Sequence, residues 1–273
     1  MLKTAFENLR SRCPLIHNIT NYVTVNDCAN MVLACGASPI MADDAAEVEE
    51  ITAICGGLNI NIGTLNKNTI PSMFLAGKKA NELGHIVLLD PVGAGASRLR
   101  TDTANRLMQE VRFDAVRGNI SEIKTLCTGS GSTKGVDADA VDAVTEANLD
   151  DGVQLVKTFA QRAGCIVAVT GAIDLVSDGE RCWCIRNGRA EMSRITGTGC
   201  QLSALMTAFL VANPDHKLAA AAAAVCMMGL AGEIGWANMQ PGDGNSTYRN
   251  RIIDAIFNMT GDALEKGAKY ELR

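Results

Sequence analysis

The chain contains no run of basic residues and no long apolar segment. It has 25 basic and 30 acidic residues among 273, which gives a net charge of −5. Nucleic acids and anionic membranes are bound through basic clusters, so we expect neither as a partner. The longest apolar tract, Leu218 to Met228, is mostly alanine and too short to cross a bilayer. Residues 1–7 include an acid and no apolar run, so we expect no signal peptide and a cytoplasmic protein.

Histidine is scarce, and the cysteines are not spaced as metal ligands. The sequence has three scattered histidines and ten cysteines, of which only Cys182 and Cys184 are close together. In a strand these two lie on one face and do not form a paired zinc knuckle. A zinc site therefore has little support, and we expect buried, reduced thiols.

The overall composition of the chain is typical of a compact protein with a large core. Hydrophobic residues make up 47% of the chain and charged residues 20%. This balance gives no sign of disorder, and the sequence contains no internal repeat and no linker. We therefore expect residues 1–273 to form a single domain.

Segments typical of strands alternate with segments typical of helices along most of the chain. The strands are expected at 14–19, 38–41, 58–64, 85–90, 114–119 and 165–169, with a hairpin at 173–177 and 181–185. The helices are expected at 2–12, 28–34, 45–53, 68–84, 98–112, 120–126, within 137–163 as two stretches, and at 200–212, 216–238 and 248–267, with a loop at 128–135. This alternation predicts an α/β fold, with a mainly parallel central sheet flanked by helices on both sides.

Polar or glycine-rich residues follow four of these segments. They are Asp90 to Gly95, Arg117 to Glu122, Thr170-Gly171, and Thr196 to Cys200. The carboxyl ends of parallel strands meet at one edge of a sheet, where α/β proteins bind ligands. We therefore expect these four segments to form one site.

The side chains in these segments suit phosphoryl transfer. Asp90 and Glu122 are carboxylates for Mg²⁺, Arg117 can bind a nucleotide phosphate, and the loop of Gly197 and Gly199 leads into a helix N-terminus that favours an anion. Glu122 also follows Asn119 by three residues, which is the spacing of a helix capping box. From the residues alone, this structural interpretation stays open.

Asn119-x-x-Glu122 together with Gly197-Thr198-Gly199 resembles the ribokinase-type kinases, whose usual tetrad is Gly-Ala-Gly-Asp. Within that superfamily, the chain is similar to the hydroxyethylthiazole kinases over essentially its whole length. The most specific feature is Cys200, because most ribokinase-like enzymes have aspartate there. The matching segments are His17 to Thr24, Ser38 to Met41, Asp90 to Gly95, Arg117 to Asn119, and Thr196 to Cys200.

This resemblance implies a ribokinase-like three-layer fold and an ATP-dependent kinase of 4-methyl-5-(2-hydroxyethyl)thiazole in thiamine salvage. It also implies a homotrimer with substrate sites near the subunit boundaries. For the substrate, it implies that Met41 and Gly197 contact the thiazole and that Asn21 and Thr24 line a neighbour's pocket. For ATP, it implies contacts from Arg117, Thr170 and Asn119, and an anion site for the transferred group at Gly197, Thr198 and Gly199. It further implies that Asp90 and Glu122 act on Mg²⁺ largely through water and that Cys200 is catalytic.

Cys200 raises a chemical question, because a free thiol with a pKa of ~8.5 is mostly protonated at neutral pH. We expect it to orient the substrate hydroxyl and to assist weakly as a base, since a loose transition state needs little proton abstraction. Four alternatives remain: a kinase of another vitamin-precursor alcohol, an ATP-dependent dehydratase of hydrated nicotinamide nucleotides, a non-catalytic thiazole or nucleotide sensor, and a cysteine-nucleophile enzyme. The first two predict aspartate at position 200, the sensor would bind without consuming ATP, and the last needs a partner base.

Overall fold

The computed structural model describes residues 1–128 and 143–273. In that part of the chain, nine strands form one sheet in the order β2-β1-β3-β4-β5-β6-β7-β8-β9. Pairing is parallel from β2 through β6 and antiparallel from β6 to β9. The strands are β1 (Leu15–Ile19), β2 (Ser38–Met41), β3 (Gly57–Asn61), β4 (Ile86–Asp90), β5 (Ala115–Asn119), β6 (Ile166–Thr170), β7 (Asp174–Ser177), β8 (Cys182–Ile185) and β9 (Tyr270–Leu272).

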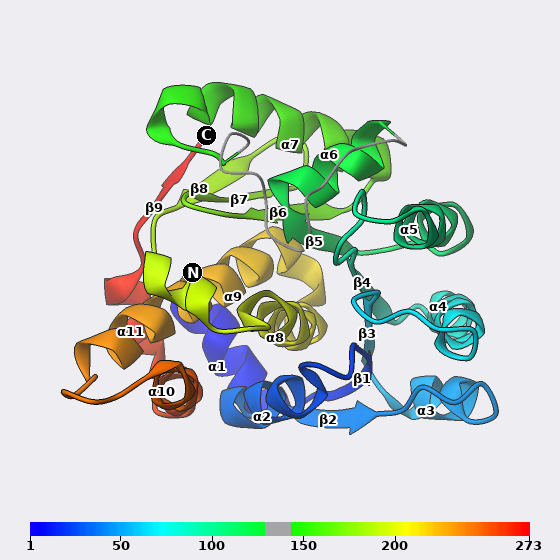
Figure 1. Ribbon diagram of the computed structural model, residues 1–273, viewed down its shortest axis with the longest axis horizontal. Helices are drawn as coiled ribbons and strands as arrows, with labels where there is room; N and C mark the ends of the chain where they lie inside the picture. Colours follow the sequence, from blue (N-terminus) through cyan, green and yellow to red (C-terminus); the bar gives the residue numbers. More distant parts are fainter. Residues whose placement is uncertain (129–142) are drawn as a thin grey trace.

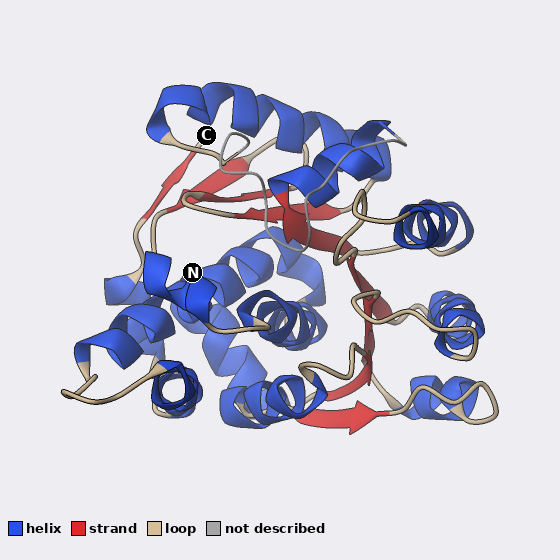
Figure 2. Ribbon diagram, viewed as in Figure 1, coloured by secondary structure: helices blue, strands red, loops and turns tan. Residues whose placement is uncertain are grey.

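Helices cover both faces of this sheet, so the predicted three-layer α/β architecture is confirmed (Figure 1). One layer contains α3 (Val48–Ile54), α4 (Thr69–Leu83), α5 (Arg98–Glu110), α6 (Ile120–Thr128) and α7 (Leu149–Ala163). The other contains α1 (Leu2–Arg12), α2 (Val25–Cys35), α8 (Thr198–Ala212), α9 (Lys217–Ala237), α10 (Asn245–Phe257) and α11 (Gly261–Gly267). Figure 2 shows the sheet bending around this second layer.

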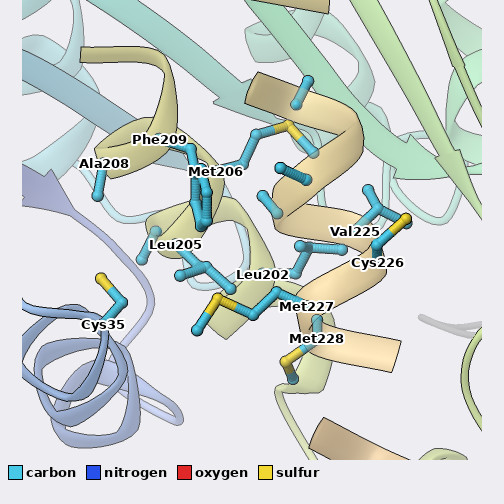
Figure 3. Packing of buried hydrophobic residues seen from close by; sticks show 14 of the residues in the cluster. Cys35, Leu202, Leu205, Met206, Ala208, Phe209, Val225, Cys226, Met227 and Met228 are labelled. Carbon is cyan, nitrogen blue, oxygen red and sulfur yellow. The ribbon is translucent and has the colours of Figure 1, made fainter. Parts of the chain in front are cut away.

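Helices α8 and α9 form the centre of the larger hydrophobic core. In Figure 3, Leu202, Met206 and Phe209 of α8 face side chains of α9, including Met227. The expectation that the longest apolar tract is too short to cross a bilayer is wrong, because the helical segment that contains it, Pro214–Ala237, is long and apolar enough. However, 78% of its most apolar window is buried inside the protein. It is therefore the core helix of this fold. All ten cysteines lie in the described residues and are free thiols. Eight of them are buried as expected, whereas Cys127 is partly buried and Cys13 is exposed.

The structure differs from the predicted elements in three places. The helix expected at 248–267 is two helices, because α10 ends at Phe257 and a new helix begins at Gly261. The Thr260 side chain caps this second helix, α11, by accepting the Ala263 N–H at 3.1 Å. The short strand β9 was not predicted, since three residues leave no periodic pattern. The helix expected at 45–53 begins only at Val48, after a turn in which the Asp44 side chain accepts the Ala46 N–H. The expected loop after residue 128 and most of the first helical stretch of 137–163 lie outside the described residues.

Candidate active site

The carboxyl edge of the sheet brings together residues from three neighbouring strands and one helix. Asp90 ends β4, Arg117 lies in β5 and Thr170 ends β6. The Arg117 guanidinium donates a hydrogen bond to Thr170 Oγ1 at 2.5 Å and lies 3.6 Å from Asp90 Oδ2. The first turn of α8 faces the same place, because a Cβ on Gly199 would approach Arg117 Nη1 to 2.5 Å. The four sequence segments therefore meet at one edge of the sheet.

Asp90 is fully buried and its two oxygens have different surroundings. Oδ2 accepts hydrogen bonds from Asn61 Nδ2 and Ser203 Oγ, both at 2.8 Å, in addition to the Arg117 ion pair. Oδ1 has no hydrogen-bond partner among the described residues. Burial raises the pKa of Asp90, and the charge of Arg117 opposes that rise. A buried oxygen without a partner is costly unless a ligand binds it, so Oδ1 suits a bound cation.

Glu122 is buried at the start of α6, and backbone groups bind both of its oxygens. Oε2 accepts the Asn119 N–H and Oε1 accepts the Gly93 N–H, each at 2.8 Å. Asn119 Oδ1 in turn accepts the Glu122 N–H at 2.9 Å, so the capping box is present. Burial, followed by the charge of Asp90, raises the pKa of Glu122 to about 7. The two carboxylates thus fit Mg²⁺, which Asp90 would bind directly or through water and Glu122 only through water.

Two glycines shape the N-terminus of α8. Gly197 caps the helix with φ +84°, in the left-handed region, and a Cβ there would overlap the side chain of Thr24. Gly199 leaves the space that the Arg117 guanidinium needs. Among the described residues, no side chain caps the helix at Gly197, so the backbone N–H groups at this end, with Thr198 as the first helical residue, are available to an anion.

Cys200 lies in the same turn and is 8% exposed. Asn21 Nδ2 donates a hydrogen bond to its sulfur at 3.2 Å, and Asn21 Oδ1 accepts from the Thr24 hydroxyl at 3.1 Å. Burial and then the charge of Asp90 raise the pKa of Cys200, while Arg117 lowers it. The thiol is therefore protonated at neutral pH, which favours hydroxyl orientation over proton abstraction as its role.

The remaining predicted residues are Met41, Asn21 and Thr24. Met41 ends β2 and is half-buried against the core. Asn21 and Thr24 are buried, whereas the side chains between them, Tyr22 and Val23, are 76% and 56% exposed. His17 is buried, with Nε2 donating to Ala42 O at 2.8 Å and Nδ1 lying 2.9 Å from Thr52 Oγ1, so both ring nitrogens are held by the protein itself.

Three residues at the site were not predicted from the sequence. Asn61 and Ser203 bind Asp90 directly, as described above. Arg100, in the first turn of α5, donates to Gly63 O at 2.6 Å and to Val92 O at 3.3 Å, and so joins the loops after β3 and β4. The alternation of asparagine with apolar residues in β3 was visible in the sequence, but it indicated only a strand. Ser203 and Arg100 carry no signal without the fold.

Comparison with known proteins identifies the family. The model of the hydroxyethylthiazole kinase family matches residues 6–262. The chain belongs to this family. It is 58% identical to the hydroxyethylthiazole kinase of Clostridium acetobutylicum over 271 residues, with 99% of each chain covered. It is 50% identical to that of Clostridium beijerinckii, with 96% of this chain and 94% of the relative covered.

Solved structures agree with the hydroxyethylthiazole kinase assignment. The hydroxyethylthiazole kinase protein from Pyrococcus horikoshii superposes with a TM-score of 0.88 at 33% identity, covering 100% of this chain and 98% of that one. A pyridoxal kinase from Staphylococcus aureus in complex with ADP has a TM-score of 0.61 at 14% identity over 95% and 97% of the two chains, which shows a shared fold. The chain is therefore a kinase with the ribokinase-like fold.

Proposed function

We propose that this site transfers the γ-phosphoryl group of ATP to the primary alcohol of 4-methyl-5-(2-hydroxyethyl)thiazole, in thiamine salvage. The observation that carries the proposal is the family match, because residues 6–262 include every residue of the carboxyl-edge cluster. The buried Asp90 oxygen, Arg117 and the open helix N-terminus supply the groups that phosphoryl transfer requires. Residues 1–273 then act as one kinase domain.

In this mechanism, Arg117, Thr170 and Asn119 bind ATP, and the N–H groups of α8 from Gly197 to Gly199 bind the transferred group. Asp90 would hold Mg²⁺, with Glu122 acting through water, and the ion would neutralise phosphate charge when bound. Positioning and charge neutralisation then provide most of the rate enhancement.

Substrate binding involves Met41, the Gly197 loop and the segment around Asn21. The site would lie near a subunit boundary of a homotrimer, and Asn21 and Thr24 would line a neighbour's pocket. The exposed Tyr22 and Val23 support this arrangement, because large apolar side chains beside a polar site are typical of covered surfaces. We also expect the enzyme to work in the cytoplasm, where its thiols stay reduced.

Cys200 orients the substrate hydroxyl and assists only weakly as a base. A Cys200→Asp variant should therefore keep or raise the turnover number, because a carboxylate accepts the same proton. Steady-state kinetics beside a folding control would check this. Complete loss of turnover in a folded variant that still binds both substrates would contradict the role.

The deciding experiment measures Mg²⁺-ATP consumption with hydroxyethylthiazole, beside hydroxymethylpyrimidine and pyridoxal. We expect ADP release that depends on the thiazole. Turnover with one of the other alcohols instead would identify a kinase of a different vitamin precursor. Binding of thiazole or nucleotide without turnover would make the protein a sensor and overturn the proposal.

A further inference from the structure

Two buried amides, those of Asn61 and Asn21, connect the Asp90 carboxylate to the Cys200 thiol. Asn61 ends β3, is 1% exposed, and pairs in register with Asp90 of β4. Its Nδ2 donates to Asp90 Oδ2 at 2.8 Å, and its Oδ1 accepts from Asn21 Nδ2 at 3.0 Å. Asn21 Nδ2 also donates to Cys200 Sγ at 3.2 Å. A continuous chain of hydrogen bonds therefore joins the two sides of the site.

The surroundings of Asn61 fix the direction of its amide. Oδ1 faces two N–H donors, the Asn21 amide and the Gly63 backbone N–H at 2.9 Å, while Nδ2 faces a carboxylate oxygen. A rotated amide would set donors against donors and an oxygen against an oxygen. Neither aspartate nor an apolar residue can supply a donor to Asp90 and an acceptor to Asn21 together.

This amide also decides which oxygen of Asp90 is available. Asn61, Ser203 and Arg117 all bind Oδ2, so Oδ1 is the oxygen left without a partner among the described residues. Without Asn61, the carboxylate could rotate and exchange its oxygens. At the other end, the Asn21 amide is held by Asn61 and Thr24, which fixes the direction of the hydrogen bond to Cys200.

We infer that Asn61 is a positioning residue for phosphoryl transfer, acting on Asp90 directly and on Cys200 through Asn21. The inference rests on the proposed function, because these two groups act on the phosphates and on the alcohol. Asn61 touches neither substrate in this role. It sets the geometry between the group that neutralises charge and the group that orients the nucleophile.

The same strand offers a matched control. Asn59 lies two residues earlier on the same face of β3 and is fully buried. Its amide donates to Asn18 Oδ1 at 3.1 Å and forms no hydrogen bond with Asp90 or Cys200 among the described residues. Substitution of Asn59 therefore removes an equally buried amide from the same strand but leaves the chain of hydrogen bonds intact.

The test compares Asn61→Leu and Asn61→Ser with Asn59→Leu and Asn59→Ser in the full chain. Loss of an outer-shell partner of a metal ligand usually costs about 10- to 100-fold, and we expect a kcat loss of this size in the Asn61 variants only. The KM for the thiazole should change little, since ground-state binding is retained. Two further readouts do not require turnover: the Kd for Mn²⁺, from isothermal titration, and the rate at which iodoacetamide alkylates Cys200, from peptide mass spectrometry. Both should change in the Asn61 variants.

Equal kcat losses in the Asn59 and Asn61 variants would overturn the inference, and so would an unchanged Mn²⁺ Kd and alkylation rate in the Asn61 variants. Circular dichroism checks folding. If the leucine variant does not fold, the comparison is made with the serine variants. If the wild-type protein fails to phosphorylate the thiazole, the proposed function is wrong. Metal binding and alkylation then still decide whether Asn61 positions the two groups.

Discussion

The amino and carboxyl edges of the parallel sheet both carry charged side chains, but these are satisfied in different ways. At the amino edge, Lys217 pairs with Asp114, whose second oxygen accepts the Val87 N–H at 2.9 Å. Arg181 pairs with Asp178 at 3.0 Å. At the carboxyl edge, Asp90 Oδ1 and Arg117 Nε are buried and lack partners among the described residues. Folding thus satisfies these charges at one edge and leaves binding capacity at the other.

A cavity at the amino edge does not by itself mark a binding site. A cavity of about 650 Å³ lies at the amino edge, lined by Trp183, Leu218, Lys217 and Arg181 among others. Asn213, which also lines it, donates to two carbonyl groups and accepts from Asn8. Polar groups that already bind one another leave little for a ligand to satisfy. We therefore expect substitutions at the carboxyl edge to change activity and those at the amino edge to change stability.

The largest effect is expected for Asp90→Asn. The substitution keeps the shape but removes the charge, and loss of one preorganised electrostatic group costs about 10²- to 10³-fold in kcat. The free energy of unfolding should change less than kcat, because relief from the burial cost that raises the pKa of Asp90 offsets the loss of the charge opposite Arg117. ADP release and urea unfolding would measure the two quantities. Normal kcat with lowered stability would reverse our assignment of this edge.

The second largest loss of activity is expected for Gly199→Ala. The added Cβ would lie 2.5 Å from Arg117 Nη1, so the guanidinium must move away from Thr170 and Asp90. A displacement of about 1 Å in a positioning group can cost about 10²-fold, and we expect this loss in kcat/KM for ATP. Gly244→Ala is the control, since a Cβ there meets nothing within 4 Å. Equal kinetics in the two variants would show that Arg117 tolerates displacement.

Glu122 gives the carboxyl edge a pH dependence. Its pKa is raised to about 7 by burial and by Asp90, so kcat/KM should rise with pH through this value if the ionised form is needed. Between the ordinary value of 4.5 and 7, the folded protein holds more protons here than the unfolded chain. The free energy of unfolding should therefore decrease as pH rises across this window.

A Glu122→Gln variant separates this group from others that titrate nearby. It should lose both the rise in kcat/KM and the corresponding fall in stability. Rate profiles and urea unfolding between pH 4.5 and 8 would measure the two effects. Profiles identical to those of the wild-type protein would assign the titration to another group.

The contrast between the edges also explains what the sequence could predict. Buried apolar runs such as 86–90, and the glycines before α8, indicated the fold class and the edge at which ligands bind. Asp90 and Arg117 were found because they stand near the carboxyl ends of expected parallel strands, where α/β sheets bind ligands. Asn61 and Ser203 were not, since an amide and a hydroxyl are common at strand ends and in helices. Their role depends on the register between β3 and β4 and on the rotation of α8, which only packing decides.

The smallest effect is expected for Lys217→Met, at the amino edge. Lys217 is 38% exposed on its side chain and Asp114 is 16% exposed, so the ion pair is partly solvated. Pairs of this kind contribute about 0.2–1 kcal/mol, and the free energy of unfolding should fall by no more than that. Because Asp114 keeps its bond to the Val87 N–H, β4 should stay in place and kcat should not change. A loss of kcat here would mean that the two edges are coupled through β4. It would contradict our expectation that substitutions at the amino edge change stability alone.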